Sequence, residues 1–346
     1  NPVRQIYGVK MSTNLDSKPF QILSLSGGGV KGLYSAKVLA EIEKHKQTKI
    51  TEHFDLICGT SIGGILALAL AYGKSPSDLS DLLEKNAQKI FPKIWFKNLR
   101  RVFSPLYSQE PLRGVLTDIF GDGKIKDLKT PVLIPTVNAS TGQPKLFKNK
   151  YHSDYTFDQD VSLVDVALAT SAAPTYFPIH SFDSKKFIDG GLVANSPALL
   201  GLHEAVNKLG IDKSNIRILS VGTMSSRFTL RSGSNNNSGY GKGWSFGKKL
   251  FDLTISANEQ MHSFMVQHAL ENGKLGSKAH YLSIDAAPTM QQGLDLDLDN
   301  SSNASLETLK ANATQSASDV SGSQLLAKML SHQADRSILI NQGVNT

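Results

Sequence analysis

The chain has 346 residues, and its 40% hydrophobic content is enough to build a substantial buried core in one or two domains. Lysine and arginine outnumber aspartate and glutamate by 37 to 30, and the net charge of +7 favours anionic partners such as phosphates or acidic lipid surfaces. The single cysteine, Cys58, excludes an internal disulfide, and the longest apolar stretch, residues 62–72, is too short to span a bilayer. No nucleic-acid-binding signature occurs, so no DNA or RNA partner is expected.

The N-terminal segment carries little information about the fold. The chain begins with Asn1, and we interpret residues 1–10 as a processing or cloning remnant within an N-terminal extension, residues 1–19. No secretory leader opens the sequence, which together with the single cysteine predicts a cytoplasmic protein. Residues 20–346 are expected to form one domain, because strand candidates occur near both of its ends.

Two strand–turn–helix units open this domain. Residues 20–25 form a short apolar run typical of a strand, and a glycine cluster separates them from a helical stretch at residues 33–45. A second strand at residues 54–58 leads through a glycine-bounded turn into a helix at residues 62–72. Two successive units of this kind favour a parallel sheet covered by helices.

Further strands and helices follow along the chain. Strands are expected at residues 131–138, 186–188, 216–221 and 280–284. Helices are expected at residues 163–171, 197–208 and 258–270. The pattern predicts an α/β sandwich whose single sheet draws on most of the chain.

Two segments differ in composition from the rest. Residues 231–249 are rich in glycine, serine and asparagine and contain several basic residues, which predicts a mobile basic loop. Asp295, Asp297 and Asp299 alternate with leucines, and this pattern indicates a surface connection. The glycine and closing glutamate of an EF-hand are missing, so the segment is not expected to bind a metal.

The segment most informative about chemistry joins the second strand to its helix. Gly59-Thr60-Ser61-Ile62-Gly63 matches G-x-S-x-G where a nucleophile elbow must lie, between a strand and a helix. The turn projects the Ser61 hydroxyl, while Gly59 and Gly63 leave room for the neighbouring backbone. The same residues would also suit an ordinary turn, so the assignment requires a base and oxyanion donors nearby.

The candidate donors lie in Gly27-Gly28-Gly29-Val30-Lys31-Gly32, directly after the first strand. With no side chains in the way, the amides of this loop can stabilise negative charge, and Gly27, Gly28 and Gly29 form the predicted oxyanion hole. The hexapeptide also matches G-x-G-x-x-G, so a nucleotide-binding regulatory protein without hydrolysis is the alternative. A Rossmann site would place an acidic residue after the second strand, where this chain has the serine turn.

Asp189 is the candidate base, because Asp189-Gly190-Gly191 presents a carboxylate at the end of a strand in an uncrowded turn. A carboxylate is ordinarily a weak base, so this role requires partial desolvation and a position close to Ser61. A Ser-His-Asp esterase is the mechanistic alternative, with a base from one of the downstream histidines. These are His152, His180, His203, His262, His268 and His280.

Taken in order, the three motifs resemble the signatures of patatin-like phospholipases. The resemblance runs from about residue 20 to residue 223, and residues 281–285 are similar to the late strand of that fold. It implies a three-layer α/β/α patatin-like fold with a mainly parallel central sheet. It also implies a Ser61–Asp189 dyad, an oxyanion hole from the first glycine loop, membrane phospholipid as substrate and no required cofactor.

Two motif positions depart from the commonest family pattern. Lys31 stands where many relatives carry arginine, and Gly191 stands where many carry alanine. Lys31 keeps the positive charge but lacks the planar donor fork of arginine, which puts any bidentate contact at this position in doubt. Neither change removes a group that the proposed chemistry needs.

More narrowly, residues 22–71 resemble bacterial patatin-like effectors of cyclic-oligonucleotide anti-phage signalling. This resemblance implies a cytoplasmic enzyme that a cyclic dinucleotide activates and that contacts the inner face of the membrane. The basic loop, with Tyr240 and Trp244 available to stack on bases, is a candidate effector contact, and a plain connector is the alternative. Whether the chain forms a homo-oligomer stays open.

Residues 90–103 interleave aromatic and basic side chains, a pattern with two interpretations. One is a membrane-docking segment or lid at the lipid headgroups. The other is an amphipathic helix packed in the core. The sequence does not decide between them.

Overall fold

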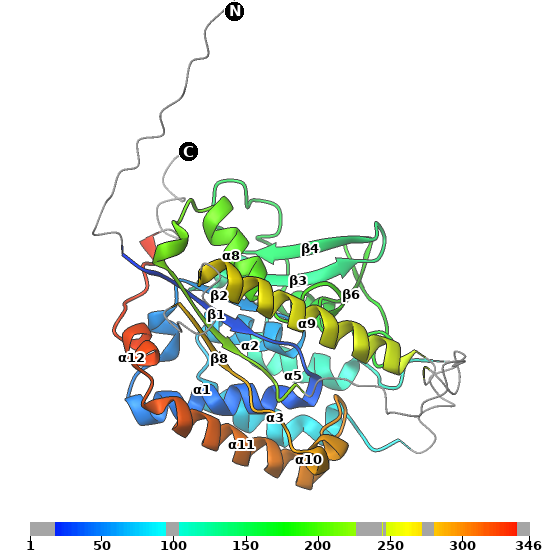
Figure 1. Cartoon of the computed structure of the whole chain (residues 1–346). Helices are drawn as coiled ribbons and strands as arrows, with labels where there is room; N and C mark the ends of the chain where they lie inside the picture. Colours follow the sequence, from blue (N-terminus) through cyan, green and yellow to red (C-terminus); the bar gives the residue numbers. More distant parts are fainter. Residues whose placement is uncertain (1–17, 95–103, 226–243, 245–246, 272–279, 338–346) are drawn as a thin grey trace, which may run out of the picture.

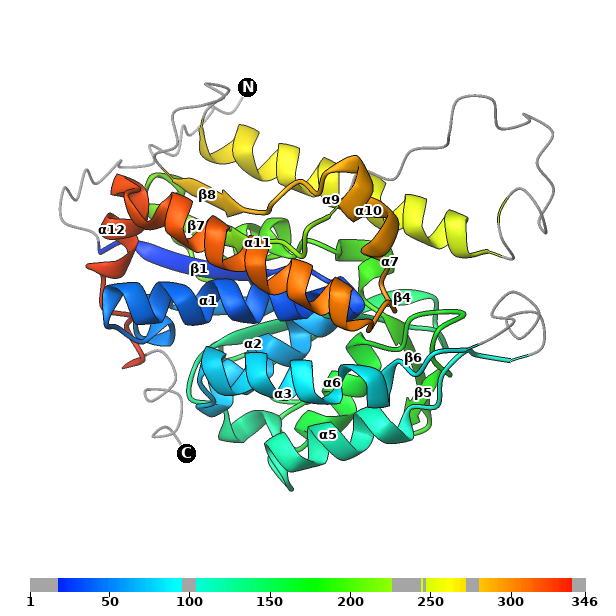
Figure 2. The same cartoon turned by 90° about the horizontal axis from the view of Figure 1, so that it is seen from below.

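The computed structural model describes residues 18–94, 104–225, 244, 247–271 and 280–337, which form one sheet with helices on both faces (Figures 1 and 2). The strands are β1 (Phe20–Leu25), β2 (Leu56–Gly59), β3 (Val132–Asn138), β4 (Gln143–Lys148), β5 (His180–Phe182), β6 (Lys185–Asp189), β7 (Ile216–Val221) and β8 (Tyr281–Ile284). Strands β3, β2, β1, β7 and β8 are consecutive in the sheet and pair in parallel. Strands β4 and β6 pair antiparallel with β3, and β5 pairs antiparallel with β6. The predicted mainly parallel sheet is confirmed.

Helices cover both faces of this sheet and complete three layers. They are α1 (Gly32–Lys46), α2 (Ile62–Tyr72), α3 (Pro76–Ile90), α5 (Glu110–Phe120), α6 (Leu163–Thr170), α7 (Gly191–Ala194), α8 (Ala198–Asn207), α9 (Lys248–Leu270), α10 (Met290–Asp295), α11 (Asn303–Ser321) and α12 (Gln324–Leu330). Alternate side chains of β1 point to opposite faces: Ile22 belongs to a cluster with Leu202 and Val266, and Leu23 to one with Leu39 and Leu66. Helices α8 and α9 therefore cover one face, and α1 and α2 the other, where α11 lies beside α1 (Figure 2). None of the helices in the described residues is both long and apolar enough to cross a membrane.

The predicted basic loop is wrong at its C-terminal end. Lys248 and Lys249 belong to the first turn of α9, where the Lys248 ammonium donates to Asp252 at 2.8 Å and to Asp297 at 2.9 Å. An ion pair between side chains four residues apart stabilises a helix. The Lys248–Asp252 pair therefore favours a helix where the composition predicts a loop. Trp244 lies in a turn just before α9, and residues 231–243 and 245–246 lie outside the described residues.

The predicted surface connection around the three aspartates agrees with Asp295, which is exposed, but is wrong for Asp299. Asp299 is buried and accepts a hydrogen bond of 2.6 Å from the Tyr107 hydroxyl. The carbonyl of Leu298 accepts the backbone N–H of Val30 at 2.9 Å, so this segment packs on the glycine loop that follows β1. The boundaries predicted for the domain and its extension stay predictions, and residues 1–17 lie outside the described part of the chain.

The register of β3 brings the ends of two strands together. Strand β4 pairs along one edge of β3, from Leu133 to Asn138, so β2 and β6 must share the other edge. Strand β2 runs parallel to β3, with Cys58 opposite Leu133, whereas β6 runs antiparallel, with Asp189 opposite Thr136. The carboxyl ends of β2 and β6 therefore face each other, although more than a hundred residues separate them in sequence.

Gly63, in the first turn of α2, lets this helix lie directly against the end of β1. A Cβ atom at this position would lie 2.2 Å from the carbonyl oxygen of Leu25, which is backbone and cannot move aside. We expect Gly63→Ala to lower the free energy of unfolding by about 2–3 kcal/mol in chemical denaturation. Gly114→Ala is the matched control, because a Cβ on this α5 residue would meet nothing within 4 Å. This substitution should leave the free energy of unfolding unchanged or raise it slightly. Equal losses of unfolding free energy in both variants would contradict the role of the Gly63 contact with Leu25.

Candidate active site

Ser61 occupies a strained turn between β2 and α2. Its φ of 55° and ψ of −124° place a non-glycine residue in a conformation that is rarely adopted. The Ser61 backbone N–H donates to the Thr170 hydroxyl oxygen at 3.1 Å, and that hydroxyl donates to the carbonyl of Pro135 at 2.6 Å. The end of α6 and strand β3 thus hold the turn. This is the geometry of a nucleophile elbow.

The side chains of Ser61 and Asp189 meet directly. The Ser61 hydroxyl donates to Oδ2 of Asp189 at 2.7 Å, and Oδ1 of Asp189 accepts the backbone N–H of Gly191 at 2.6 Å. Asp189 is only 2% exposed. Burial raises the pKa of Asp189 to about 6, although the hydrogen bonds from Ser61 and Gly191 partly oppose the rise. A carboxylate with this pKa is a stronger base than an ordinary aspartate and is still ionised at neutral pH.

The glycine loop lies beside this pair, and its three amides are not equivalent. The amide of Gly27 already donates to the carbonyl of Asn195 at 3.0 Å. The amides of Gly28 and Gly29 have no acceptor among the described residues, and both glycines line the same cavity as Ser61. We therefore narrow the candidate oxyanion donors to Gly28 and Gly29.

Space and backbone conformation require glycine at several motif positions. Gly29 has a φ of +59°, and a Cβ there would lie 2.2 Å from the carbonyl oxygen of Leu298. A Cβ would likewise lie 2.1 Å from a neighbouring atom at Gly32, Gly59 and Gly190. Gly191 has a different role, because its N–H holds the Asp189 carboxylate.

Lys31 lies on the far side of the glycine loop from Ser61. It is only 7% exposed and lines a polar cavity with Glu259, Asp252 and Asp297 rather than the cavity that contains Ser61. Burial lowers the pKa of Lys31, while the nearby carboxylates, Glu259 first among them, oppose the change.

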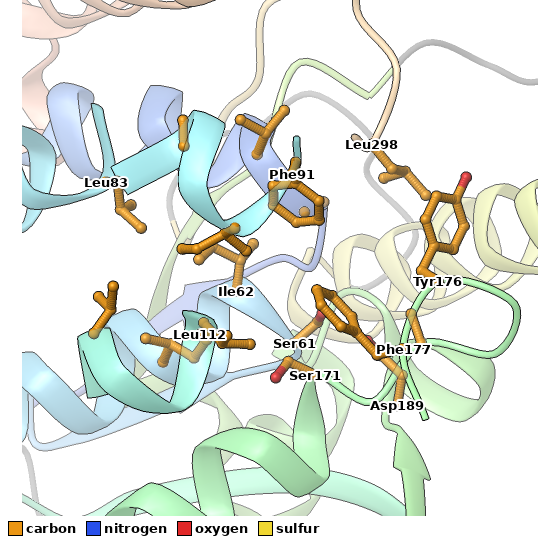
Figure 3. A pocket seen from close by; sticks show the side chains of 18 of the residues that line it. Ser61, Ile62, Leu83, Phe91, Leu112, Ser171, Tyr176, Phe177, Asp189 and Leu298 are labelled. Atoms are coloured by element: carbon orange, nitrogen blue, oxygen red, sulfur yellow. The ribbon is translucent and has the colours of Figure 1, made fainter. Parts of the chain in front are cut away.

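An apolar cavity opens beside Ser61 and Asp189 (Figure 3). Its walls come mainly from aliphatic and aromatic side chains of α2, α3, α5, α9 and the segment after α6. These include Ile62, Ile65, Leu82, Leu83, Ile90, Phe91, Leu112, Val115, Leu116, Ile119, Tyr176, Phe177, Phe251, Ile255 and Leu298. A hydrocarbon lining with few polar groups suits a fatty acyl chain.

The start of the segment 90–103 belongs to this wall. Ile90 ends α3 and is buried, and the Phe91 ring packs on Tyr107 at 5.4 Å between centroids and on Phe177 at 5.7 Å. These two residues fit the core interpretation rather than the membrane-docking one. Residues 95–103 lie outside the described residues, so the prediction for them stays untested.

The site geometry disfavours both alternatives raised by the sequence. All nine histidines are among the described residues, and none of them lines the cavity around Ser61. The Ser61 hydroxyl already bonds to Asp189, which leaves no place for an intervening imidazole. On one side the glycine loop faces an apolar cavity, and on the other it faces a polar cavity that contains the carboxylates of Asp252, Glu259 and Asp297, so neither side favours the phosphates of a nucleotide.

Several supporting residues had no recognisable signal in the sequence. Thr170 contacts Ser61 across 109 positions, and Asn258 contacts Gly191 across 67, so no local motif marks either residue. Asn195 had a weak signal, because it is a polar residue shortly after the Asp189 turn, and the structure shows that it is buried.

Comparison with known proteins agrees with this geometry. The family model described as patatin-like phospholipase matches residues 23–202. The chain belongs to the patatin-like phospholipase family. The resemblance in the three motifs and the patatin fold are both confirmed, and members of this family are serine lipid acyl hydrolases.

Curated relatives cover most of the chain. A protein named cGAMP-activated phospholipase from Vibrio cholerae is 40% identical over 324 residues, 86% of this chain and 90% of the relative. One of the same name from Pseudomonas aeruginosa is 41% identical over 323 residues, 92% of this chain and 94% of the relative. Among solved structures, human GIVD cytosolic phospholipase A2 aligns with 94% of this chain and 60% of that one, at a TM-score of 0.46 and 10% identity. That likeness is too distant to support a functional argument.

The pKa of Asp189 predicts the pH dependence of this patatin-like site. Only the ionised carboxylate can accept the Ser61 proton, so kcat/KM should fall as pH drops through about 6 and level off above it. The measurement is a pH profile of kcat/KM with a soluble acyl ester whose own ionisation does not change over this range. A half-maximal value near pH 4 would mean that burial does not raise the pKa of the base.

Proposed function

We propose that this chain hydrolyses acyl esters of membrane phospholipids by means of a Ser61–Asp189 dyad. The observation that carries the proposal is the 2.7 Å hydrogen bond between the serine hydroxyl and a buried carboxylate beside an apolar cavity. The hydroxyl is a weak nucleophile at neutral pH, and the adjacent base supplies the activation that it needs. The cavity supplies a place for a hydrocarbon chain next to the reacting atoms.

In the first step, Ser61 Oγ attacks the ester carbonyl carbon while Asp189 takes the hydroxyl proton. The carbonyl oxygen becomes an oxyanion that the amides of Gly28 and Gly29 stabilise, and loss of one such donor typically costs about 3 kcal/mol of barrier. The tetrahedral intermediate then expels the lysolipid alcohol, which receives the proton from Asp189. This leaves an acyl group on Ser61.

In the second step, water hydrolyses the acyl-enzyme. Asp189 takes a proton from the water as its oxygen attacks the acyl carbon, and the same two amides stabilise the second oxyanion. Collapse of this intermediate returns the proton to Ser61 Oγ and releases the fatty acid. The chain's own residues thus suffice for both steps.

We also propose that cGAMP or a related cyclic dinucleotide activates the enzyme. The support comes from relatives that are 38–41% identical over most of the chain and are named cGAMP-activated phospholipases. The substrate would bring the protein to the inner face of the membrane as a peripheral, cytoplasmic enzyme. The net charge of +7 would favour that contact with anionic lipid.

The variants Ser61→Ala and Asp189→Asn test the dyad. Each removes one partner of the proton transfer, so fatty acid release should fall roughly a thousandfold or more. The assay uses vesicles of phosphatidylethanolamine and phosphatidylglycerol with cGAMP present, and the wild type should be active only under that condition.

Ser24→Ala is the matched control for this pair. Ser24 is buried in β1, and its hydroxyl has no hydrogen-bond partner in the part of the chain that the structure describes. Its loss should therefore leave turnover close to that of the wild type. Turnover that survives in Ser61→Ala would contradict the dyad.

A further inference from the structure

The Asn258 side chain of helix α9 hydrogen-bonds the turn that follows the proposed catalytic base. Nδ2 of Asn258 donates to the carbonyl of Gly191 at 2.8 Å, and Oδ1 of Asn258 accepts the backbone N–H of Asn195 at 3.1 Å. The N–H of Gly191 in turn donates to Asp189 at 2.6 Å. Asn258 and Asp189 therefore bind the two backbone groups of the same residue, Gly191.

The next residue of α9 contacts the oxyanion loop in a similar way. Oε2 of Glu259 accepts Nδ2 of Asn195 at 2.9 Å and the Ser225 hydroxyl at 3.2 Å. The carbonyl of Asn195 accepts the Gly27 N–H at 3.0 Å, directly before the two free amides. Glu259 thus reaches the glycine loop through Asn195.

The surroundings of Glu259 contain both signs of charge. The buried ammonium of Lys31 attracts its carboxylate, while Asp285 and Asp252 lie on the same side of the glycine loop. Burial raises the pKa of Glu259, and the hydrogen bonds from Asn195 and Ser225 oppose the rise. Because a desolvated carboxylate costs free energy, helix packing alone would be served better by an apolar side chain.

We propose that Asn258 and Glu259 are positioning residues that keep the Asp189 turn and the oxyanion loop in register with Ser61. The inference rests on the proposed hydrolase function and adds a requirement to it. Two successive residues of one helix hold the two halves of the site, with Asn195 as the shared partner. Loss of the Asn258 or the Glu259 side chain should therefore misplace groups that act in the transition state, without removing any of those groups.

The test compares Asn258→Ala and Glu259→Ala with the wild type in the presence of cGAMP. With a soluble p-nitrophenyl ester, kcat should fall about tenfold to a hundredfold, while KM changes by no more than about threefold. Fluorophosphonate labelling of Ser61 should slow by a similar factor, because it needs the same alignment. Glu259→Gln keeps an acceptor for Asn195 and should recover most of the activity lost in Glu259→Ala.

Gln260→Ala is the matched control on the same helix. Gln260 is exposed, and within the described part of the chain its amide donates only to Ser256 of its own helix. This variant should behave like the wild type in every assay. Thermal unfolding of all variants separates loss of alignment from loss of fold.

Two results would overturn the inference. One is unchanged kcat in both alanine variants, and the other is a loss that follows the melting temperature with no recovery in Glu259→Gln. Failure of the proposed function is a separate outcome, because it would show as turnover that persists in Ser61→Ala. If Ser61→Ala is inactive while Asn258→Ala and Glu259→Ala are fully active, only the positioning role is wrong.

Discussion

The hydrogen bond between Ser61 and Asp189 is the interaction on which the other features of the site depend. It joins a strained serine to a carboxylate that is 2% exposed. Because burial raises the pKa of Asp189 to about 6 in the folded state, folding takes up a proton between about pH 4 and pH 6. The stability that this group contributes is present at low pH and is lost as pH rises through 6, by roughly 3 kcal/mol. At neutral pH the fold thus keeps the Asp189 carboxylate ionised at a cost in stability, in the position that the proposed base requires.

The sheet and the helices that cover it hold Ser61 and Asp189 in position. Strands β2 and β6 approach along one edge of β3 from opposite directions, which brings the Ser61 turn after β2 close to Asp189 at the end of β6. Thr170 holds the serine turn, and the N–H of Gly191 holds the carboxylate. Asn258 and Glu259 of α9 connect the Asp189 turn, through Asn195, to the loop that carries the candidate oxyanion donors. The proposed reacting groups come from separate strands and loops, but a few residues, among them Thr170 and Gly191, hold them in position.

The sequence predicts the proposed reacting groups better than the residues that hold them in position. Ser61 and Asp189 each lie in a short glycine-flanked turn after an apolar run, so local pattern suffices to find them, and the same pattern defines the βα units of the fold. Part of the cavity wall comes from α3 and α5, whose apolar residues are typical of any core helix. Asn258 and Glu259 lie on a helix that was expected only over residues 258–270, because the composition before it is typical of a loop. Lys248 reverses that expectation through one ion pair within the helix, to Asp252, and one tertiary ion pair, to Asp297.

A crystal structure of the enzyme inactivated with a long-chain alkyl fluorophosphonate would test the central claim most directly. The phosphorus should be bonded to Ser61 Oγ, with its oxygen about 2.7–3.1 Å from the amide nitrogens of Gly28 and Gly29. The alkyl chain should fill the apolar cavity beside Asp189. Phosphorus on another residue, or an oxygen turned away from both amides, would contradict the account.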